Sequence, residues 1–498
     1  MTAPHASHTF FWHDYETFGR VPRRDRPAQF AGIRTDADLN ELGEEANWFC
    51  QPAPDTLPDP EACLLTGILP QQALAQGMAE HRFAERILGV LGAPGTVGVG
   101  YNSIRFDDEV TRFLFWRNLI DPYGREWQNG CSRWDLLDTV RACWALRPEG
   151  ITWPKHTSGD MAGRPSFKLE HLSAANGLAH EAAHDALSDV RATIALARLV
   201  KTAQPRLWDF CLKLRDKRAV QAEIGVGRPF VHLSGMYPVE RGCTAIVWPL
   251  APHPTNKNEL IVWDCSADPA LLAGLSAEDI KLRLYTRRED LPEGVERLPI
   301  KTIHINKSPV VIGNLKTLAG AGGPAERWQL DVAQALQHAE AAAALAPQLA
   351  GLWPAVFNRL TGAGAGGAPG ADTDVDEDLY GGFVGNDDRR QLERLRALDG
   401  EALANKRVAF EDNRLDELLF RYRARNFPQT LDSTEQQRWL QHCAERLHQG
   451  AGGGLTLQAF FERIDQLAEQ ANEREDERAQ GLLEALYDYA ESIAPEAP

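Results

Sequence analysis

The first 200 residues of this 498-residue chain alternate between apolar, strand-like runs and segments with helical spacing. Residues 9–12, 29–35 and 96–101 have strand character, and the last of these runs is rich in glycine and bounded by turns. Residues 134–146 and 185–200 carry apolar side chains at the spacing of an amphipathic helix. Strands and helices in alternation predict an α/β domain at the N-terminus.

The pattern changes after this region, and the length itself predicts two to four domains because one hydrophobic core rarely serves so long a chain. Between residues 205 and 349, short strand-like runs predict a small β domain with helical inserts. These runs are 230–233, 244–250, 260–264 and 300–305.

The last third of the chain has two parts. Residues 361–378 are rich in Gly, Ala and Asp and predict a flexible linker. Residues 379–493 are mostly amphipathic helix, interrupted at residues 450–454 by a run of glycines. The predicted domains are therefore residues 9–201, 205–350 and 354–495.

Composition narrows the class of protein. The chain has 43% hydrophobic and 25% charged residues, as globular proteins do, and no export signal or membrane-spanning run. Its eight cysteines form no C-x-x-C pair and no metal-type spacing with histidine, so we expect a cytoplasmic, reduced protein. The net charge of −17 argues against a nucleic-acid partner when taken alone. It is not decisive, because arginines gather between Arg105 and Arg147 and a site for divalent metals must itself be acidic.

Two carboxylates end the first strand. Asp14 and Glu16 are two residues apart, and residues i and i+2 of a strand point to the same face. Both could therefore bind one metal ion. Alone, the pair is equally consistent with a solvated strand end.

A second acidic group follows the glycine-rich strand at residues 96–101. Asp107, Asp108 and Glu109 open the next helix, where carboxylates complement the helix dipole. The helix dipole explains the acidic residues Asp108 and Glu109 by themselves. It does not explain why a neighbouring strand, which ends at Tyr101, should place them there.

The third group is His184, Asp185 and Asp189. Asp185 is a candidate N-cap for the helix at residues 185–200. Asp189 then lies one turn inside that helix, and His184 lies just before it. In isolation the group fits a capped surface helix with a chance histidine.

Together, the order D-x-E, then D, then H-x-x-x-x-D resembles the DEDD exonucleases, in the branch that carries histidine. The resemblance implies a ribonuclease H-like fold. It also implies two Mg²⁺ ions about 3.5–4 Å apart, for which Mn²⁺ could substitute, and both ions would be held by oxygen ligands. On this pattern Asp14 bridges the metals, Glu16 and Asp189 complete one site, and Asp107 holds the other. His184 takes a proton from the attacking water, since its ordinary pKa lies near neutral pH.

A closer similarity extends over nearly the whole chain. Residues 11–19, 25–30, 100–111, 132–138, 146–150 and 184–193, and beyond them 201–207, 304–307 and 420–430, resemble the bacterial exodeoxyribonuclease I family. The resemblance implies a nuclease domain, an SH3-like β domain and a helical C-terminal domain that together enclose single-stranded DNA. It also implies 3′→5′ degradation of that DNA to deoxynucleoside 5′-monophosphates, with roles in repair and recombination.

The same resemblance implies a set of DNA-groove residues in which cations follow phosphates and aromatic rings stack on bases. Trp127 could instead belong to the core, and Arg141 could pair with Asp138 three residues earlier. Lys168 occupies a position where the family has Arg. A guanidinium can bind a phosphate with two parallel hydrogen bonds, whereas a lysine ammonium offers only a point charge. The groove residues are Glu16, Arg112, Tyr123, Trp127, Arg141, Arg147 and Lys168.

Two further expectations concern the partner and the substrate. The family implies docking of the acidic, apolar tail of single-stranded DNA-binding protein, for which Arg147, Lys217 or Arg228 could supply a cationic lip. Arg147 could equally serve DNA or an internal carboxylate. The oligomeric state has no sequence signature, and a monomer is the default. The alternative activity is that of an exoribonuclease of the oligoribonuclease or RNase T type, whose chains are shorter.

Overall fold

The computed structural model describes residues 8–179, 185–358 and 373–495. The chain divides into two compact units. The first unit contains residues 1–132, 181–191 and 361–498, and the second contains residues 133–180 and 192–360. Within the described residues, no helix is long and apolar enough to cross a membrane.

The first unit is built on a sheet with strand order β3-β2-β1-β4-β5. β1 pairs antiparallel with β2 and parallel with β4, and β2 pairs antiparallel with β3. The strands are β1 (Thr9–Thr17), β2 (Pro27–Thr35), β3 (Glu41–Phe49), β4 (Thr96–Gly100) and β5 (Ser132–Asp135), the last of which lies where the chain leaves the unit.

Sequence patterning found three of these strands and missed two. β1 runs past the predicted apolar stretch and includes both Asp14 and Glu16. β3 escaped detection because it is mostly exposed and rich in glutamate, so it lacks apolar alternation. The predicted helix at residues 134–146 is wrong at its start, where Trp134 and Asp135 belong to β5 and the helix begins at Leu136.

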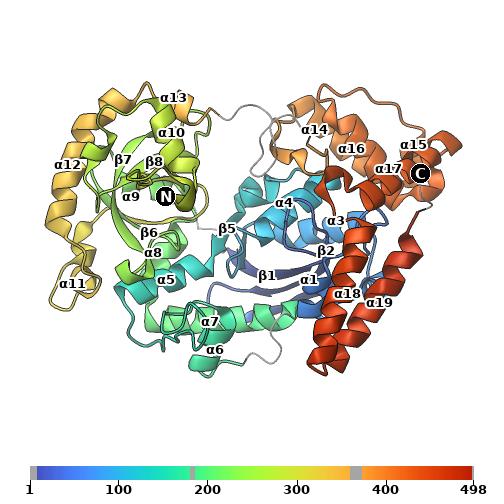
Figure 1. The fold of residues 1–498 in the computed structure, drawn as a ribbon, viewed down its shortest axis with the longest axis horizontal. Coiled ribbons are helices and arrows are strands. Elements are labelled where there is room, and N and C mark those ends of the chain that lie inside the picture. Colours follow the sequence, from blue (N-terminus) through green and yellow to red (C-terminus); the bar gives the residue numbers. More distant parts are fainter. Residues whose placement is uncertain (1–7, 180–184, 359–372, 496–498) are drawn as a thin grey trace, which may run out of the picture. The chain divides into compact units, whose positions relative to one another are not determined.

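Helices from both ends of the chain complete the first unit. The N-terminal helices are α1 (Pro60–Thr66), α2 (Pro70–Gln76), α3 (Glu80–Leu91) and α4 (Asp107–Arg117). The C-terminal helices are α14 (Asn386–Arg396), α15 (Gly400–Ala404), α16 (Arg414–Asn426), α17 (Ser433–Gln449), α18 (Leu457–Glu473) and α19 (Glu477–Ile493). Figure 1 shows α18 and α19 side by side, and their apolar faces share a core with Phe18 and Ala28 of the N-terminal part.

The start of the C-terminal segment corrects one prediction. Residues 361–378 were predicted to be a flexible linker, and the part up to residue 372 lies outside the described residues. Residues 374–378 are packed instead. Val375 joins a core cluster with Phe113 and Trp116, and Asp376 is only 3% exposed. The acidic residues of this stretch pair with arginines, as Asp376 does with Arg26 and Arg425.

The second unit contains a five-stranded antiparallel sheet of order β10-β6-β7-β8-β9 around its own core. Its strands are β6 (Phe230–Leu233), β7 (Thr244–Pro252), β8 (Glu259–Asp264), β9 (Ile300–His304) and β10 (Val310–Ile312). The first four match the predicted runs to within two residues at each end, whereas β10 was missed because three residues carry no periodicity.

The helices of the second unit are α5 (Leu136–Leu146), α6 (Leu169–Ala175), α8 (Pro205–Lys213), α9 (Lys217–Ile224), α10 (Ala277–Tyr285), α11 (Pro324–Arg327), α12 (Val332–Leu349) and α13 (Trp353–Val356). Those between residues 205 and 349 are the predicted helical inserts. Helix α7 (Ala186–Ala203) begins in the first unit and continues in the second. The predicted fold class, an α/β domain followed by a β domain and a helical C-terminal segment, is confirmed.

Candidate active site

The end of β1 presents two carboxylates on one face of the sheet. Asp14 and Glu16 alternate with Tyr15, which is buried on the opposite face in a cluster with Phe11 and Phe30. The Tyr15 hydroxyl lies 3.0 Å from Oγ1 of Thr111 in α4. This contact fixes the strand against the helix that carries the next carboxylate.

Asp107 is the first residue of α4, and the backbone of β1 holds its side chain. The Tyr15 N–H donates to Oδ1 of Asp107 at 3.1 Å, and Asp107 is 3% exposed. Because that N–H lies between Asp14 and Glu16 in the chain, the bond brings the third carboxylate to the same strand end. The neighbouring Asp108 has a different role, since it forms a buried ion pair with Arg125 at 2.5 Å.

The fourth carboxylate comes from the first turn of α7. Asp185 caps this helix as predicted, with Oδ2 accepting the Ser188 N–H at 2.9 Å. Asp189 lies one turn further on. One oxygen each of Asp14, Glu16 and Asp189 lie within 4.8 Å of one another, so the structure brings these three predicted ligands together.

Crowded negative charge shifts the titration of this cluster. Burial, followed by the charges of Asp107, Glu16 and Asp189, raises the pKa of Asp14 well above its usual value. Burial and the charge of Asp189 are the largest causes that raise the pKa of Glu16 to about 8. The largest electrostatic influences on both groups all come from carboxylates. Asp185 is one of these carboxylates, although its sequence position suggested only a helix cap. The sequence signal for its place near the cluster was its i, i+4 spacing from Asp189.

This donor set fits divalent metal ions. Hard cations such as Mg²⁺ prefer carboxylate oxygens, and cations would relieve the repulsion that raises these pKa values. Asp14, Glu16 and Asp189 could hold one ion together. Asp107, which the backbone of β1 holds at the same strand end, could contribute to a second.

The predicted general base, His184, lies outside the described residues. His13, the residue before Asp14, has a different character. It is 2% exposed and stacks near Phe30, and burial lowers its pKa to about 3. His13 is therefore neutral at physiological pH and packs in the core on the side of the strand away from the carboxylates.

Two of the predicted groove residues are engaged inside the first unit. Arg112 is 4% exposed, bonds Glu126 at 2.7 Å and Glu109 at 2.6 Å, and lies over the Tyr123 ring at 5.3 Å. These contacts give its guanidinium a structural role and leave little of it for a phosphate. The same is true of Arg117 and Arg125, which are buried in ion pairs, so the arginine-rich stretch is less cationic at its surface than its composition suggested.

The exposure of Trp127 and the contacts of Arg141 decide between the alternatives that the sequence left open for these two residues. Trp127 is 66% exposed, so the core interpretation is wrong and the ring is available for stacking. Arg141 donates to Asp138 at 2.7 Å, as its helical spacing suggested, and lies over the Phe167 ring at 5.8 Å.

The remaining cations lie at the surface of the second unit. Arg147 is exposed at the end of α5, and the one hydrogen bond of its guanidinium in the described residues goes to the Leu146 carbonyl at 2.5 Å. An internal carboxylate partner is therefore absent from the described part of the chain. Lys168 is exposed and lies 3.1 Å from Glu170. Lys217 bonds Asn258 at 2.6 Å, and Arg228 bonds backbone carbonyls of α9.

Comparison with known proteins places this site in a family. Three family profiles match successive parts of the chain: an exonuclease at residues 11–197, an exonuclease I SH3-like domain at 215–359 and an exonuclease I C-terminal domain at 373–493. The chain is 44% identical to exodeoxyribonuclease I of Escherichia coli over 492 residues, which cover 97% of this chain and 98% of that protein. The chain belongs to the exodeoxyribonuclease I family. The resemblance predicted from the sequence motifs is confirmed.

Solved structures agree with this family assignment. Exonuclease I from Methylocaldum szegediense matches with a TM-score of 0.89 at 46% identity, over 98% of this chain and 99% of that one. The E. coli exonuclease I complex with a dA16 oligonucleotide matches with a TM-score of 0.88 at 44% identity, over 98% and 100% of the two chains. Two other structures of exodeoxyribonuclease I family members are a zinc-bound E. coli complex with single-stranded DNA and a structure of SSB/exonuclease I with an inhibitor.

Proposed function

We propose that this exodeoxyribonuclease I family member degrades single-stranded DNA from its 3′ end to deoxynucleoside 5′-monophosphates, in DNA repair and recombination. The observation that carries the proposal is the convergence of Asp14, Glu16 and Asp189 within 4.8 Å, with Asp107 bonded to the strand between the first two. Relatives of this length and identity act as exodeoxyribonucleases, and one of them was crystallised with a DNA oligonucleotide.

The chemistry assigns a role to each group. Two Mg²⁺ ions, or Mn²⁺ in their place, would stabilise the charge that develops on the attacking and leaving oxygens. Asp14 would contribute to both ion sites, Glu16 and Asp189 would complete one, and Asp107 would serve the other. His184, one residue before the Asp185 cap, would accept the proton of the attacking water. Trp127 offers an exposed ring on which a base can stack irrespective of sequence.

Digestion of labelled oligonucleotides tests the proposal. A single strand labelled at its 5′ end should yield a ladder that shortens from the 3′ end, and a 3′ label should appear at once as mononucleotide. EDTA should stop both reactions. A matched RNA oligonucleotide should be degraded far more slowly; equal or faster digestion of RNA would favour an exoribonuclease of the RNase T type instead.

His184→Ala should reduce the hydrolysis rate by roughly 10²–10⁴-fold, the usual contribution of a general base. The rate of the wild type should fall at acidic pH as the histidine becomes protonated. If the variant keeps this acidic limb, another group accepts the proton. His171→Ala is a matched control, because His171 lies on α6 of the second unit, where its ring bonds Ser166 at 2.7 Å.

We also propose single-stranded DNA-binding protein as a partner, through its acidic tail. Arg147 supports this because its guanidinium is exposed and bonds only one backbone carbonyl in the described residues. The net charge of −17 would repel an acidic tail at long range, so the attraction must be local. A tail peptide should bind the wild type and bind Arg147→Ala more weakly. Unchanged peptide affinity combined with impaired DNA binding would assign Arg147 to DNA instead.

A further inference from the structure

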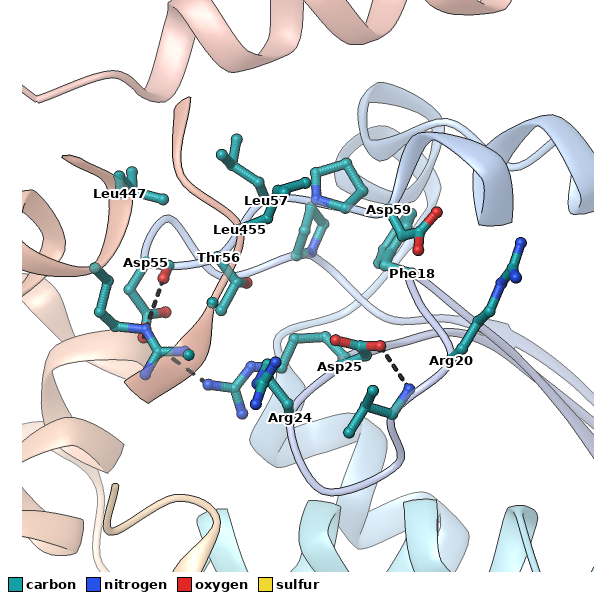
Figure 2. Close-up of a pocket in the computed structure, with 17 residues that line it drawn as sticks. Phe18, Arg20, Arg24, Asp25, Asp55, Thr56, Leu57, Asp59, Leu447 and Leu455 are labelled. Carbon is teal, nitrogen blue, oxygen red and sulfur yellow. Dashed lines mark hydrogen bonds and ion pairs between the residues drawn. The ribbon is translucent and has the colours of Figure 1, made fainter. Parts of the chain in front are cut away.

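A second cavity in the first unit lies apart from the four carboxylates. Its volume is about 410 Å³, and three stretches of the chain line it: residues 18–26, 52–59 and 446–455. Figure 2 shows the view into it. Asp14, Glu16, Asp107 and Asp189 are absent from its lining, so it is separate from the candidate active site.

Four arginines line this cavity: Arg20, Arg24, Arg26 and Arg446. Arg26 is 4% exposed, and its Nε and Nη1 atoms have no hydrogen-bond partner within the described residues. Nη1 lies 3.9 Å from the Glu80 carboxylate, and Nη2 is paired with Asp376 at 3.1 Å. A buried donor without a partner is destabilising, so Nε is the group that calls for a further acceptor. Arg20 is exposed and forms no ion pair with any described residue.

Each of the three aspartates of the lining has a partner in the described chain. Asp59 caps α1 by accepting the Ala62 N–H at 3.1 Å, and Asp25 accepts the Val21 N–H at 2.7 Å. Asp55 is paired with Arg425 at 2.7 Å and lies 3.8 Å from both Arg26 and Arg446. The cationic groups left to meet a ligand are therefore Arg20 and the Nε of Arg26.

The other wall of the cavity is apolar. Figure 2 shows Leu57 and Leu455 on one side, with Arg24 across from them. Phe18, Val21 and Leu447 add further apolar side chains to the lining. The space thus combines a cationic end with an apolar surface, and its volume lies within the range of about 300–1,000 Å³ that is usual for small-molecule sites.

A glycine fixes the cationic side. Gly453 has φ +70°, and a Cβ atom there would lie 2.8 Å from Nη2 of Arg24. The missing side chain lets the loop after α17 pack against Arg24. Arg24 is also held by Glu377 at 3.0 Å, so its position is built into the fold.

We propose that this cavity is a second, non-catalytic site for a deoxynucleoside 5′-monophosphate, whose phosphate meets the arginines and whose sugar and base cover the apolar wall. An inorganic phosphate would leave the apolar wall exposed, and an uncharged nucleoside would leave the Arg26 Nε unpaired. A mononucleotide supplies both parts. The inference rests on the proposed function, because that reaction makes this ligand, and the loop at residues 18–26 directly follows the strand that carries Asp14 and Glu16.

Calorimetric titration of the full-length protein tests the site. Deoxyadenosine monophosphate, deoxyadenosine and inorganic phosphate are each titrated in EDTA, so that the active site holds no cation to attract an anion. The monophosphate should bind with one-to-one stoichiometry, and deoxyadenosine and phosphate should each bind at least about tenfold more weakly, since charge-assisted bonds and apolar burial each contribute that much.

Variants then locate the binding. Arg20→Ala should weaken monophosphate binding about tenfold, because one charge-assisted contact is lost. The substitution should not destabilise the fold, because Arg20 is exposed. Leu455→Ala should weaken the monophosphate but not inorganic phosphate. Arg82→Ala is the matched control, because Arg82 is an exposed arginine paired with Glu85 outside the cavity. Its affinity should equal that of the wild type.

Several results would overturn the proposal. They are no monophosphate binding at millimolar concentration, equal affinity for inorganic phosphate, or unchanged affinity in Arg20→Ala. Asp14→Ala should bind the monophosphate in EDTA like the wild type, and a loss there would place the ligand in the active site. If the protein binds the monophosphate as expected but hydrolyses no DNA, the proposed function fails while the nucleotide site stands.

Discussion

Asp14, Glu16 and Asp107 are positioned by a few bonds around one strand end. Strand geometry puts Asp14 and Glu16 on one face, and the Tyr15 N–H between them holds Asp107. The site is therefore rigid where the ligands must converge, and substitutions of single carboxylates should act on chemistry more than on folding.

Asp14→Ala should abolish hydrolysis in Mg²⁺ and leave the affinity for single-stranded DNA nearly unchanged, because a metal ligand is lost while the exposed stacking residue Trp127 is kept. Gel-based hydrolysis and fluorescence anisotropy measure the two quantities. Asp38→Ala, at an exposed turn, is the control. More than a few per cent residual activity would remove Asp14 from the ligand set.

Glu16 should link metal binding to pH. Its folded-state pKa of about 8 lies above the ordinary value, so at pH 7 the metal-free chain holds a proton that a bound cation must displace. Titration with Mg²⁺ at pH 7 should release protons, seen as a dependence of the binding heat on buffer ionisation enthalpy. Glu16→Gln should release fewer. Proton release identical to the wild type would place the titrating proton elsewhere.

The same shift predicts how stability depends on pH without metal. A carboxyl whose pKa is raised on folding binds more protons in the folded than in the unfolded state, so stability falls as pH rises from about 4.3 to 8. In EDTA, the melting temperature should drop between pH 6 and pH 8.5. Glu16→Gln should flatten this drop, and a slope as steep as that of the wild type would contradict the assignment.

At the scale of elements, a buried ionic cluster ties α16 to the N-terminal loops of the first unit. Arg425 bonds Asp55 at 2.7 Å and Asp376 at 3.1 Å, and Arg26 bonds Asp376 at 3.1 Å. Burial alone would raise the pKa of both aspartates, but Arg425 and its neighbours outweigh it and hold each pKa well below the usual range. The cluster joins residues more than 300 positions apart.

Arg425→Ala should lower the free energy of unfolding by roughly 3–5 kcal/mol at pH 7, because removing one partner leaves buried carboxylates uncompensated. Arg82→Ala, from an exposed pair, should cost about 0–1 kcal/mol. Urea unfolding measures both. A loss near that of the control would mean that the cluster is as well solvated as a surface pair.

The depressed pKa values set the pH range of this contribution. A carboxyl with a lowered folded-state pKa contributes fully above its unfolded value of about 3.9 and loses that contribution as pH falls through the folded value. Wild-type stability should therefore decline below about pH 4. Arg425→Ala should show a shallower decline there, since its aspartates have less favourable pairing to lose.

At the scale of the whole molecule, the C-terminal segment is part of the first unit's core rather than an appendage. Phe18 and Ala28 pack with Leu457 and Phe460, and Trp116 packs with Val375 and donates to its carbonyl at 2.8 Å. Large apolar surfaces of the nuclease part would be exposed without it.

A chain ending at residue 358 should therefore be insoluble or lack a cooperative thermal transition, because these core surfaces would face water. Co-expression of residues 373–498 as a separate polypeptide should restore solubility and a transition. Size-exclusion chromatography and calorimetry are the measurements. A soluble, cooperatively folding truncated chain would show that the N-terminal part has an independent core.

The sequence by itself determined the features that depend on near neighbours. The D-x-E pair on one face of β1, the Asp185 cap and four strands of the second sheet follow from local periodicity and hydrogen bonding. Their order along the chain was specific enough to indicate the family. These inferences succeeded because each depends on residues a few positions apart.

Only the tertiary structure decided what depends on distant partners. Arg112 and Asp376 look like surface charges in the sequence, yet both are buried in ion pairs, while Trp127 is exposed. The exposed, glutamate-rich β3 is a strand because β2 supplies its hydrogen bonds. Burial and pairing arise when segments hundreds of residues apart pack together, and no local pattern records which segments those will be.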